Sequence, residues 1–144
     1  YICYTTPTLP APLTVTGDAR VTLYVSSDAP DTDFMVRLCD VDEAGRSVKL
    51  ADGILAARFR NGFSAPEYLE PGKVEKLVIR TSKISHCFLP GHRLRVSVTS
   101  GAKHFVFPNS NTKDAYNSTE SRVAHNTVWH GGAAPSHILL HVER

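Results

Sequence analysis

The chain has 144 residues, a net charge of +2 at pH 7 and 42% hydrophobic residues. This length suffices for one domain with one apolar core. Its Lys and Arg residues are scattered rather than clustered, which argues against nucleic-acid binding. No apolar run approaches the roughly 18 residues of a membrane-spanning helix, so we expect no contact with a membrane.

Apolar and polar residues alternate in many short segments, which is the pattern of strands with one buried face. The clearest expected strands are 21–25, 34–38, 94–98 and 138–142. Further extended segments fit at 13–16, 47–51, 54–60, 74–80 and 122–130. No helical period persists for three turns. The sequence therefore predicts an all-β fold, either a two-sheet sandwich or a jelly roll.

Six acidic residues lie between Ser27 and Ser47, namely Asp28, Asp31, Asp33, Asp40, Asp42 and Glu43. The segment from Asp40 begins like a calcium-binding EF-hand loop, but Ala44 stands at the third ligand position. We expect Asp42 to Gly45 to be a hairpin turn with a positive φ at Gly45. The strand before it separates the two acidic groups by about 20 Å, so they cannot form one site. At Asp31 and Asp33, local loop hydrogen bonds and an adventitious cation remain alternatives.

The sequence offers no recognisable catalytic centre. The segment 62–66 lacks the second glycine of a G-x-S-x-G nucleophile elbow. His86 and Cys87 would point to opposite faces in an extended chain, so we expect a hydrogen-bonded His beside a buried Cys. His137 and His141 lie about 13 Å apart on a strand, too far to share one metal. We therefore predict no catalytic, cofactor-binding or metal-ligating residue, and no cofactor.

Three cysteines are odd in number and far apart in the sequence, which does not suit a disulfide framework: Cys3, Cys39 and Cys87. They favour a reducing compartment, so we expect a cytoplasmic protein. The chain opens with Tyr1, and its single methionine is Met35. We therefore expect a piece of a longer protein.

Several short motifs, in order along the chain, together resemble one known family. They are LTVTGDA from Leu13, SDAPDTDF from Ser27, LADGIL from Leu50, LEPG from Leu69, HCFLPGHRLR from His86 and PSH from Pro135. These motifs resemble the C-terminal domain of the X-Pro dipeptidyl-peptidase and cocaine-esterase-like (CocE/NonD) serine hydrolases. The sequence departs from the family pattern after Phe107 and Pro108, where Lys113 stands in place of a glycine.

The resemblance implies that residues 1–144 form a single jelly-roll (galactose-binding-like) β-sandwich at the C-terminal end of a longer α/β-hydrolase. The catalytic triad would lie in the upstream α/β-hydrolase domain, which would be the partner of this domain. The implied function is a non-catalytic accessory domain that supports the catalytic domain of an esterase or peptidase and bounds its active-site mouth. Two alternatives stay open: a carbohydrate-binding module, with Trp129 as a stacking platform, and an oligomerisation module. We otherwise expect Trp129 in the core.

Apolar residues crowd into two turn-rich segments, 59–69 and 104–108, where a solitary domain would prefer polar residues. We name six of them as candidates for docking on the upstream domain: Phe63, Tyr68, Leu69, Phe105, Val106 and Phe107. The alternative is that these side chains fold back as small satellite cores under long loops.

Overall fold

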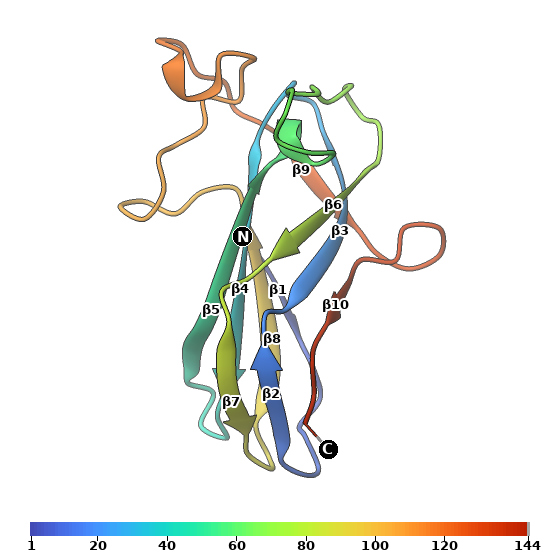
Figure 1. Cartoon of the computed structure of the whole chain (residues 1–144), viewed down its shortest axis with the longest axis vertical. Coiled ribbons are helices and arrows are strands. Elements are labelled where there is room, and N and C mark those ends of the chain that lie inside the picture. Colours follow the sequence, from blue (N-terminus) through green and yellow to red (C-terminus); the bar gives the residue numbers. More distant parts are fainter. Residues whose placement is uncertain (144) are drawn as a thin grey trace.

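The computed structural model describes residues 1–143, which form an elongated β-sandwich (Figure 1). The larger sheet is antiparallel, with strands in the order β1 (Ile2–Thr5), β8 (Arg93–Thr99), β4 (Asp33–Val41) and β5 (Ser47–Ala56). The all-β sandwich predicted from the alternating pattern is therefore confirmed.

The facing layer is built around β3 (Arg20–Ser27). One edge of β3 pairs with β6 (Glu75–Arg80), and the other pairs with β10 (His137–Leu139) and then β9 (Asn126–Trp129). A separate two-stranded sheet joins β2 (Leu13–Gly17) to β7 (Ile84–Phe88). Two short 3-10 turns, Ala57–Phe59 and Ala115–Asn117, interrupt the loops.

The core lies between the two layers and follows the two-residue period. In β8 the residues Leu94, Val96 and Val98 are buried, while those between them are partly exposed. They join one apolar cluster with inward residues of the other strands, among them Phe34 and Leu23. Burial of this shared layer is the main source of stability for such a fold.

Several strand bounds differ from the prediction. The segments 47–51 and 54–60 form one strand, β5, which ends at Ala56 because the chain then turns through Ala57–Phe59. The segment 122–130 is extended only over β9. Neither β1 nor β7 was predicted. Trp129 is not a core residue: it is 44% exposed, and its Nε1 donates to the Ser26 hydroxyl.

The predicted hairpin between β4 and β5 is confirmed. Gly45 has φ of 84°, and its amide donates to the Asp42 carbonyl at 3.0 Å. The Asp42 carboxylate accepts from the Arg46 amide at 2.8 Å. This acidic residue therefore serves the turn and not a metal.

No helix within residues 1–143 is long and apolar enough to cross a membrane.

Gly53 marks the point where the two layers approach most closely on one side. A Cβ atom at this position would lie 2.4 Å from the backbone oxygen of Arg80, at the end of β6. We predict that Gly53→Ala lowers the free energy of unfolding by about 1–3 kcal/mol, because backbone atoms must move to make room. Urea denaturation of the domain measures this loss. Gly101→Ala is the matched control, since no atom lies within 4 Å of its Cβ position; equal stability of both variants would contradict the close approach.

Candidate functional site

Three irregular segments meet at one end of the sandwich, at the top of Figure 1. They are the loop between β3 and β4, the turn that follows β5, and the long segment 100–125 after β8. Loops of such length within a compact domain are commonly functional. This end therefore contains the candidate site.

Asp31 and Asp33 are fully buried where the loop enters β4. A buried carboxylate must be paired or hydrogen-bonded, because it loses its hydration. Asp31 accepts hydrogen bonds from the backbone amide of Arg58 at 2.9 Å and from its guanidinium at 2.5 Å. The Asn109 side chain supplies a further donor to Asp31 at 2.8 Å.

Asp33 accepts hydrogen bonds from two side chains of the long segment 100–125. The Asn109 amide donates to it at 2.8 Å, and the Tyr116 hydroxyl donates at 2.7 Å. Burial and this bond to Asp33 raise the pKa of Tyr116 to about 12. We call these five residues the aspartate network: Asp31, Asp33, Arg58, Asn109 and Tyr116. It ties all three segments together.

The aspartate network shows how Asp31 and Asp33 are paired. The Arg58 guanidinium forms an ion pair with Asp31 and also lies over the Tyr116 ring, 5.2 Å from its centroid. Both carboxylates are thus engaged by side chains from distant segments, and not by the local loop hydrogen bonds expected from the sequence. Across residues 1–143, no group of three or more His, Cys, Asp or Glu side chains is placed to hold a metal ion.

A second contact closes the long segment onto the same loop. The Asp28 carboxylate accepts from the backbone amide of His125 at 2.9 Å and contacts its Nδ1 at 2.8 Å. These two bonds hold the pKa of Asp28 below its usual value. The segment 100–125 is therefore fixed in its middle, at Asn109 and Tyr116, and at its C-terminal end, at His125.

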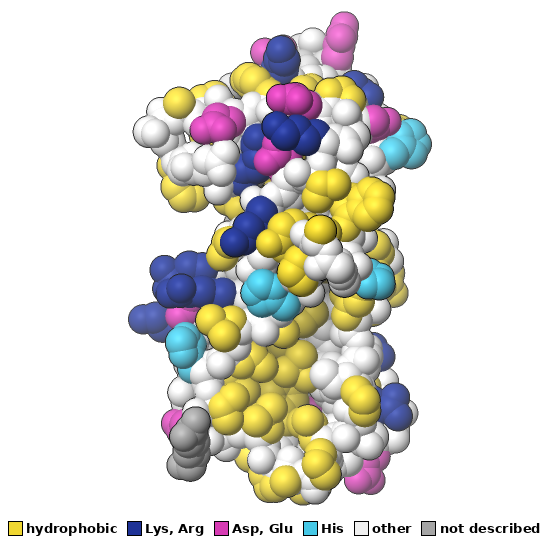
Figure 2. Space-filling model, turned by 90° about the vertical axis from the view of Figure 1, so that its right-hand side faces the viewer, with side chains coloured by type: hydrophobic (Ala, Val, Ile, Leu, Met, Phe, Trp, Pro, Cys, Tyr) yellow, Lys and Arg dark blue, Asp and Glu magenta, His cyan; other side chains and the backbone are white. Residues whose placement is uncertain are grey.

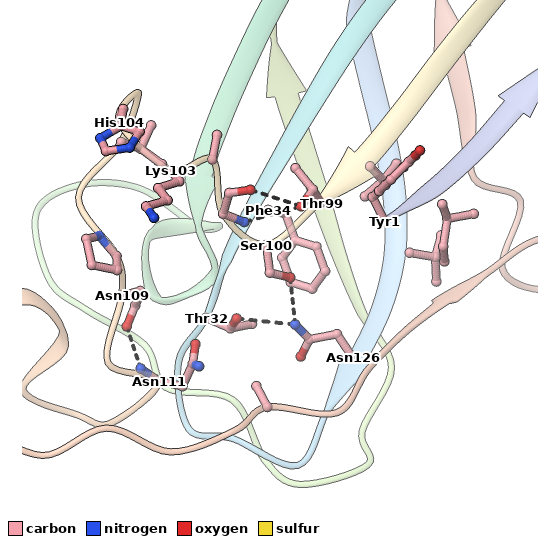
Figure 3. A pocket seen from close by; sticks show the side chains of 18 residues that line it. Tyr1, Thr32, Phe34, Thr99, Ser100, Lys103, His104, Asn109, Asn111 and Asn126 are labelled. Atoms are coloured by element: carbon pink, nitrogen blue, oxygen red, sulfur yellow. Dashed lines mark hydrogen bonds between the residues drawn. The ribbon is translucent and has the colours of Figure 1, made fainter.

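A cavity of about 640 Å³ lies under this segment (Figure 3). Its apolar side includes Phe34 and Val98, and its polar side includes Lys103 and Asn126. The Asn126 side chain donates to the Ser100 hydroxyl at 2.8 Å, whereas its buried Oδ1 has no partner within residues 1–143. The cavity can therefore accept a polar group, but its lining offers no activated nucleophile.

One aspartate and two histidines meet elsewhere, where β4 of the larger sheet faces β7 of the two-stranded sheet. Asp40 on β4 contacts His86 Nε2 at 2.7 Å and His92 Nδ1 at 2.8 Å. The prediction of a hydrogen-bonded His86 is thus confirmed. The prediction of a buried Cys87 is wrong: this thiol is exposed, while Cys39 is buried. The Cys87 sulfur lies near the Phe88 carbonyl, so His86 and Cys87 are not arranged as a base and its thiol.

The six docking candidates do not share one position. Leu69 is only 5% exposed and belongs to the core, so its side chain is not available for docking on another domain. Tyr68 and Val106 are half-buried; the Tyr68 hydroxyl donates to the Lys113 carbonyl, and Val106 lines the cavity of Figure 3. Phe63, Phe105 and Phe107 are 79%, 58% and 85% exposed.

Sequence reasoning missed Arg58, Asn109 and Tyr116. Their contacts with Asp31 and Asp33 span 27 to 83 residues, and local patterns carry no information on such pairs. One signal was available: two acidic residues directly before a strongly apolar strand require partners if they are buried. Segment 100–125 has its non-glycine left-handed residues at His104, Asn111 and Ala115, and not at Lys113, where the family pattern has glycine.

Within residues 1–143, Asn109 is the one side chain that donates to both buried carboxylates. We predict that Asn109→Ala lowers the free energy of unfolding by about 1–3 kcal/mol, because two buried acceptors lose a donor. Asn61→Ala is the control, since Asn61 bonds only at the surface, to Glu67. Chemical denaturation measures both. A loss for Asn109→Ala no larger than the control would contradict the assigned role of the network.

The raised pKa of Tyr116 predicts a pH dependence. An unfolded Tyr loses its proton near pH 10, whereas folded Tyr116 keeps it to about pH 12. Its stabilising contribution is therefore complete below about pH 10 and is lost as the pH rises toward about 12. Thermal midpoints should fall less steeply above about pH 9 in Tyr116→Phe than in the wild type. A curve for Tyr116→Phe that runs parallel to that of the wild type would contradict this assignment.

The chain is similar in sequence to one described family and to known esterases. Residues 2–139 match the family described as the X-Pro dipeptidyl-peptidase C-terminal non-catalytic domain. The cocaine esterase of Rhodococcus sp. (strain MB1 Bresler) is 39% identical over 142 residues, which is 96% of this chain and 25% of that protein. A putative serine esterase of Mycobacterium bovis (strain ATCC BAA-935 / AF2122/97) is 34% identical over 73% of this chain and 20% of its own length.

Solved structures agree with this assignment. An aminopeptidase from the marine sediment archaeon Thaumarchaeota archaeon superposes with a TM-score of 0.92 at 28% identity, over 99% of this chain and 26% of that one. An alpha-amino acid ester hydrolase gives a TM-score of 0.92 at 26% identity, over 99% of this chain and 25% of the hydrolase. This chain thus spans about a quarter of the length of these relatives. The family resemblance in the sequence is confirmed, and the chain belongs to the C-terminal non-catalytic domains of the X-Pro dipeptidyl-peptidase and CocE/NonD-like hydrolases.

Proposed function

We propose that this domain supports the catalytic domain of a serine hydrolase and that its loop end bounds the active-site mouth. The parent protein, meaning the longer hydrolase chain that contains this domain, would cleave an ester or an acyl-amide bond. The names of the relatives support this class, because they include a cocaine esterase, an aminopeptidase and an alpha-amino acid ester hydrolase. The Ser, Asp and His triad would belong to the upstream domain.

The aspartate network is the observation that supports this proposal most directly. It uses two buried charges to fix three loops, an arrangement that contributes little net stability compared with apolar packing. Its result is a fixed loop end on which Phe63 and Phe107 stay mostly exposed. Aromatic rings held rigidly in solvent are typical of a contact surface, because burying them against a partner is favourable.

The cavity beside these loops fits the same proposal. A catalytic domain that packs on the exposed Phe side chains would also cover the cavity of about 640 Å³. Loops of this domain would then form one wall of a cleft between domains, where ligand sites commonly lie. Neither alternative function has comparable support. The indole nitrogen of Trp129 donates a hydrogen bond to the Ser26 hydroxyl. Trp129 is also a single exposed ring on its strand, β9.

We predict that Phe107→Ser in the parent protein lowers kcat/KM by about fivefold or more, mainly by raising KM. The reason is that the substrate and the catalytic domain would lose an apolar contact with this side chain. Phe105→Ser should act in the same direction. The substrates to assay are a p-nitrophenyl ester and an X-Pro anilide, whichever the parent protein turns over.

Leu89→Ser is the matched control, because Leu89 is 53% exposed in the turn at the opposite end of the sandwich. This control should leave kcat/KM within about twofold. Thermal midpoints of all three variants should stay near the wild type, since exposed side chains contribute little to folding. Kinetics of both Phe variants indistinguishable from Leu89→Ser would contradict the placement of this loop end at the active-site mouth.

A further inference from the structure

The larger sheet has an outer face, which points away from the apolar core. Side chains along a strand alternate between the two faces of a sheet, so the residues between the core positions point to this outer face. They include Arg37 and Cys39 on β4, and Arg95 and Ser97 on β8. The side of β10 differs in character, because hydrophobic side chains gather there (Figure 2).

A concavity of about 440 Å³ lies on this outer face. Three cationic side chains line it: Arg37 from β4, Lys49 from β5 and Arg95 from β8. The strand register brings them together, since Cys39 pairs with Arg95 on one side and with Lys49 on the other. Arg37 lies two residues before Cys39 on the same face. Diagonal neighbours on adjacent strands are about 7–8 Å apart, so these long side chains reach one place.

The positive charge of the concavity is only partly balanced. The Asp52 carboxylate pairs with Arg37 Nε at 2.8 Å and with Lys49 Nζ at 3.1 Å. Arg95 forms no ion pair within residues 1–143; its Nε donates to the Thr5 hydroxyl at 2.9 Å. Three cations thus share one carboxylate, and the excess of two positive charges equals the net charge of the whole chain. Like charges this close repel one another, so a bound anion would be stabilising.

Both guanidinium groups are oriented in a way that suits an anion. Within residues 1–143, each forms its hydrogen bonds through Nε alone, Arg37 to Asp52 and Arg95 to Thr5. The Nε bond restrains each group, while the two terminal nitrogens keep their donors free. Such planar donors match the paired oxygens of a carboxylate or a phosphate. The Ser47 hydroxyl also lines the concavity and can donate to the same oxygens.

The floor of the concavity is less polar than its rim. It includes Met35 and Cys39, which are buried although they point to the outer face, so neighbouring side chains cover them. The side chain of Arg37 is 40% exposed and that of Lys49 is 51% exposed, so a ligand can reach their charged ends. Attraction between opposite charges is stronger beside such a surface than in bulk water.

We propose that this concavity binds a small oxyanion, a carboxylate or a phosphate, held jointly by Arg37 and Arg95. Lys49 adds a third positive charge at the side of β5. A neutral ligand would leave the excess charge unbalanced, and a cation would be repelled. The proposal concerns residues of the larger sheet and does not depend on the role of the loop end.

Modification of arginine by phenylglyoxal tests this site in the parent protein. The reagent attacks accessible guanidinium groups, and mass spectrometry of the peptides gives the rate at each residue. Inorganic phosphate and acetate are added separately, at an ionic strength kept constant with chloride. An anion at ten times its dissociation constant leaves about one site in eleven free, so modification of Arg37 and Arg95 should slow by about tenfold. Arg122 is the internal control, because its side chain is similarly exposed, at 46%, and its rate should not change.

Arg95→Gln tests whether the two residues share one anion. In this variant, phosphate should protect Arg37 at least about threefold less than in the wild type, because the bound anion loses half of its guanidinium donors. Arg20→Gln is the matched control: it removes an equal charge at the start of β3, in the facing layer, and should leave the protection intact. The thermal midpoint of each variant shows whether it is folded, and the wild-type measurement needs no substitution.

Protection of Arg37 and Arg95 by either anion supports the proposal, and the stronger of the two anions identifies the class of ligand. Three results would overturn it. The first is an unchanged rate at both residues with phosphate and with acetate. The second is equal protection of Arg37 in Arg95→Gln and in Arg20→Gln. The third is resistance of both residues to the reagent without any added anion, which would mean that another part of the parent protein covers the concavity.

Discussion

Two antiparallel sheets share one apolar layer, and the extent to which each sheet covers the other determines the rest of the structure. The layers close against each other where Gly53 of β5 meets Arg80 of β6. They stay apart on the side of β1, where the partly exposed Tyr4 lies beside the core residues Val96 and Val98. An apolar groove that stays open to water is unfavourable, and larger apolar surfaces of this kind are typical of contact sites.

The loop end obeys a second constraint, which is electrostatic. Two carboxylates enter the interior at the start of β4, and their partners must come from distant segments because the loop itself offers too few donors. Arg58, Asn109 and Tyr116 meet this need and so fix loops that would otherwise move freely. A non-catalytic domain gains from this arrangement a rigid surface at which a partner domain can rest.

Much of the fold could be predicted from the sequence because strands reveal themselves through local alternation. The alternation of apolar residues in β3, β4 and β8 involves only residues two positions apart. The turn at Gly45 likewise depends on a single positive φ angle. The missed strands β1 and β7 are short and mixed in polarity, so pairing partners determine them. Trp129 was expected in the core because aromatic residues usually lie there, but its strand sits at the rim of the narrower layer. The aspartate network depends on long-range contacts, which no local pattern contains.

The central claim is that the aspartate network fixes the loop end of the domain. Amide hydrogen exchange of the domain, followed over segment 100–125, tests it most directly. We expect the amides of Ser110 and Arg122, which donate within this segment, to exchange more slowly than those of the exposed turn 62–66. Exchange as fast as in that turn would contradict the account.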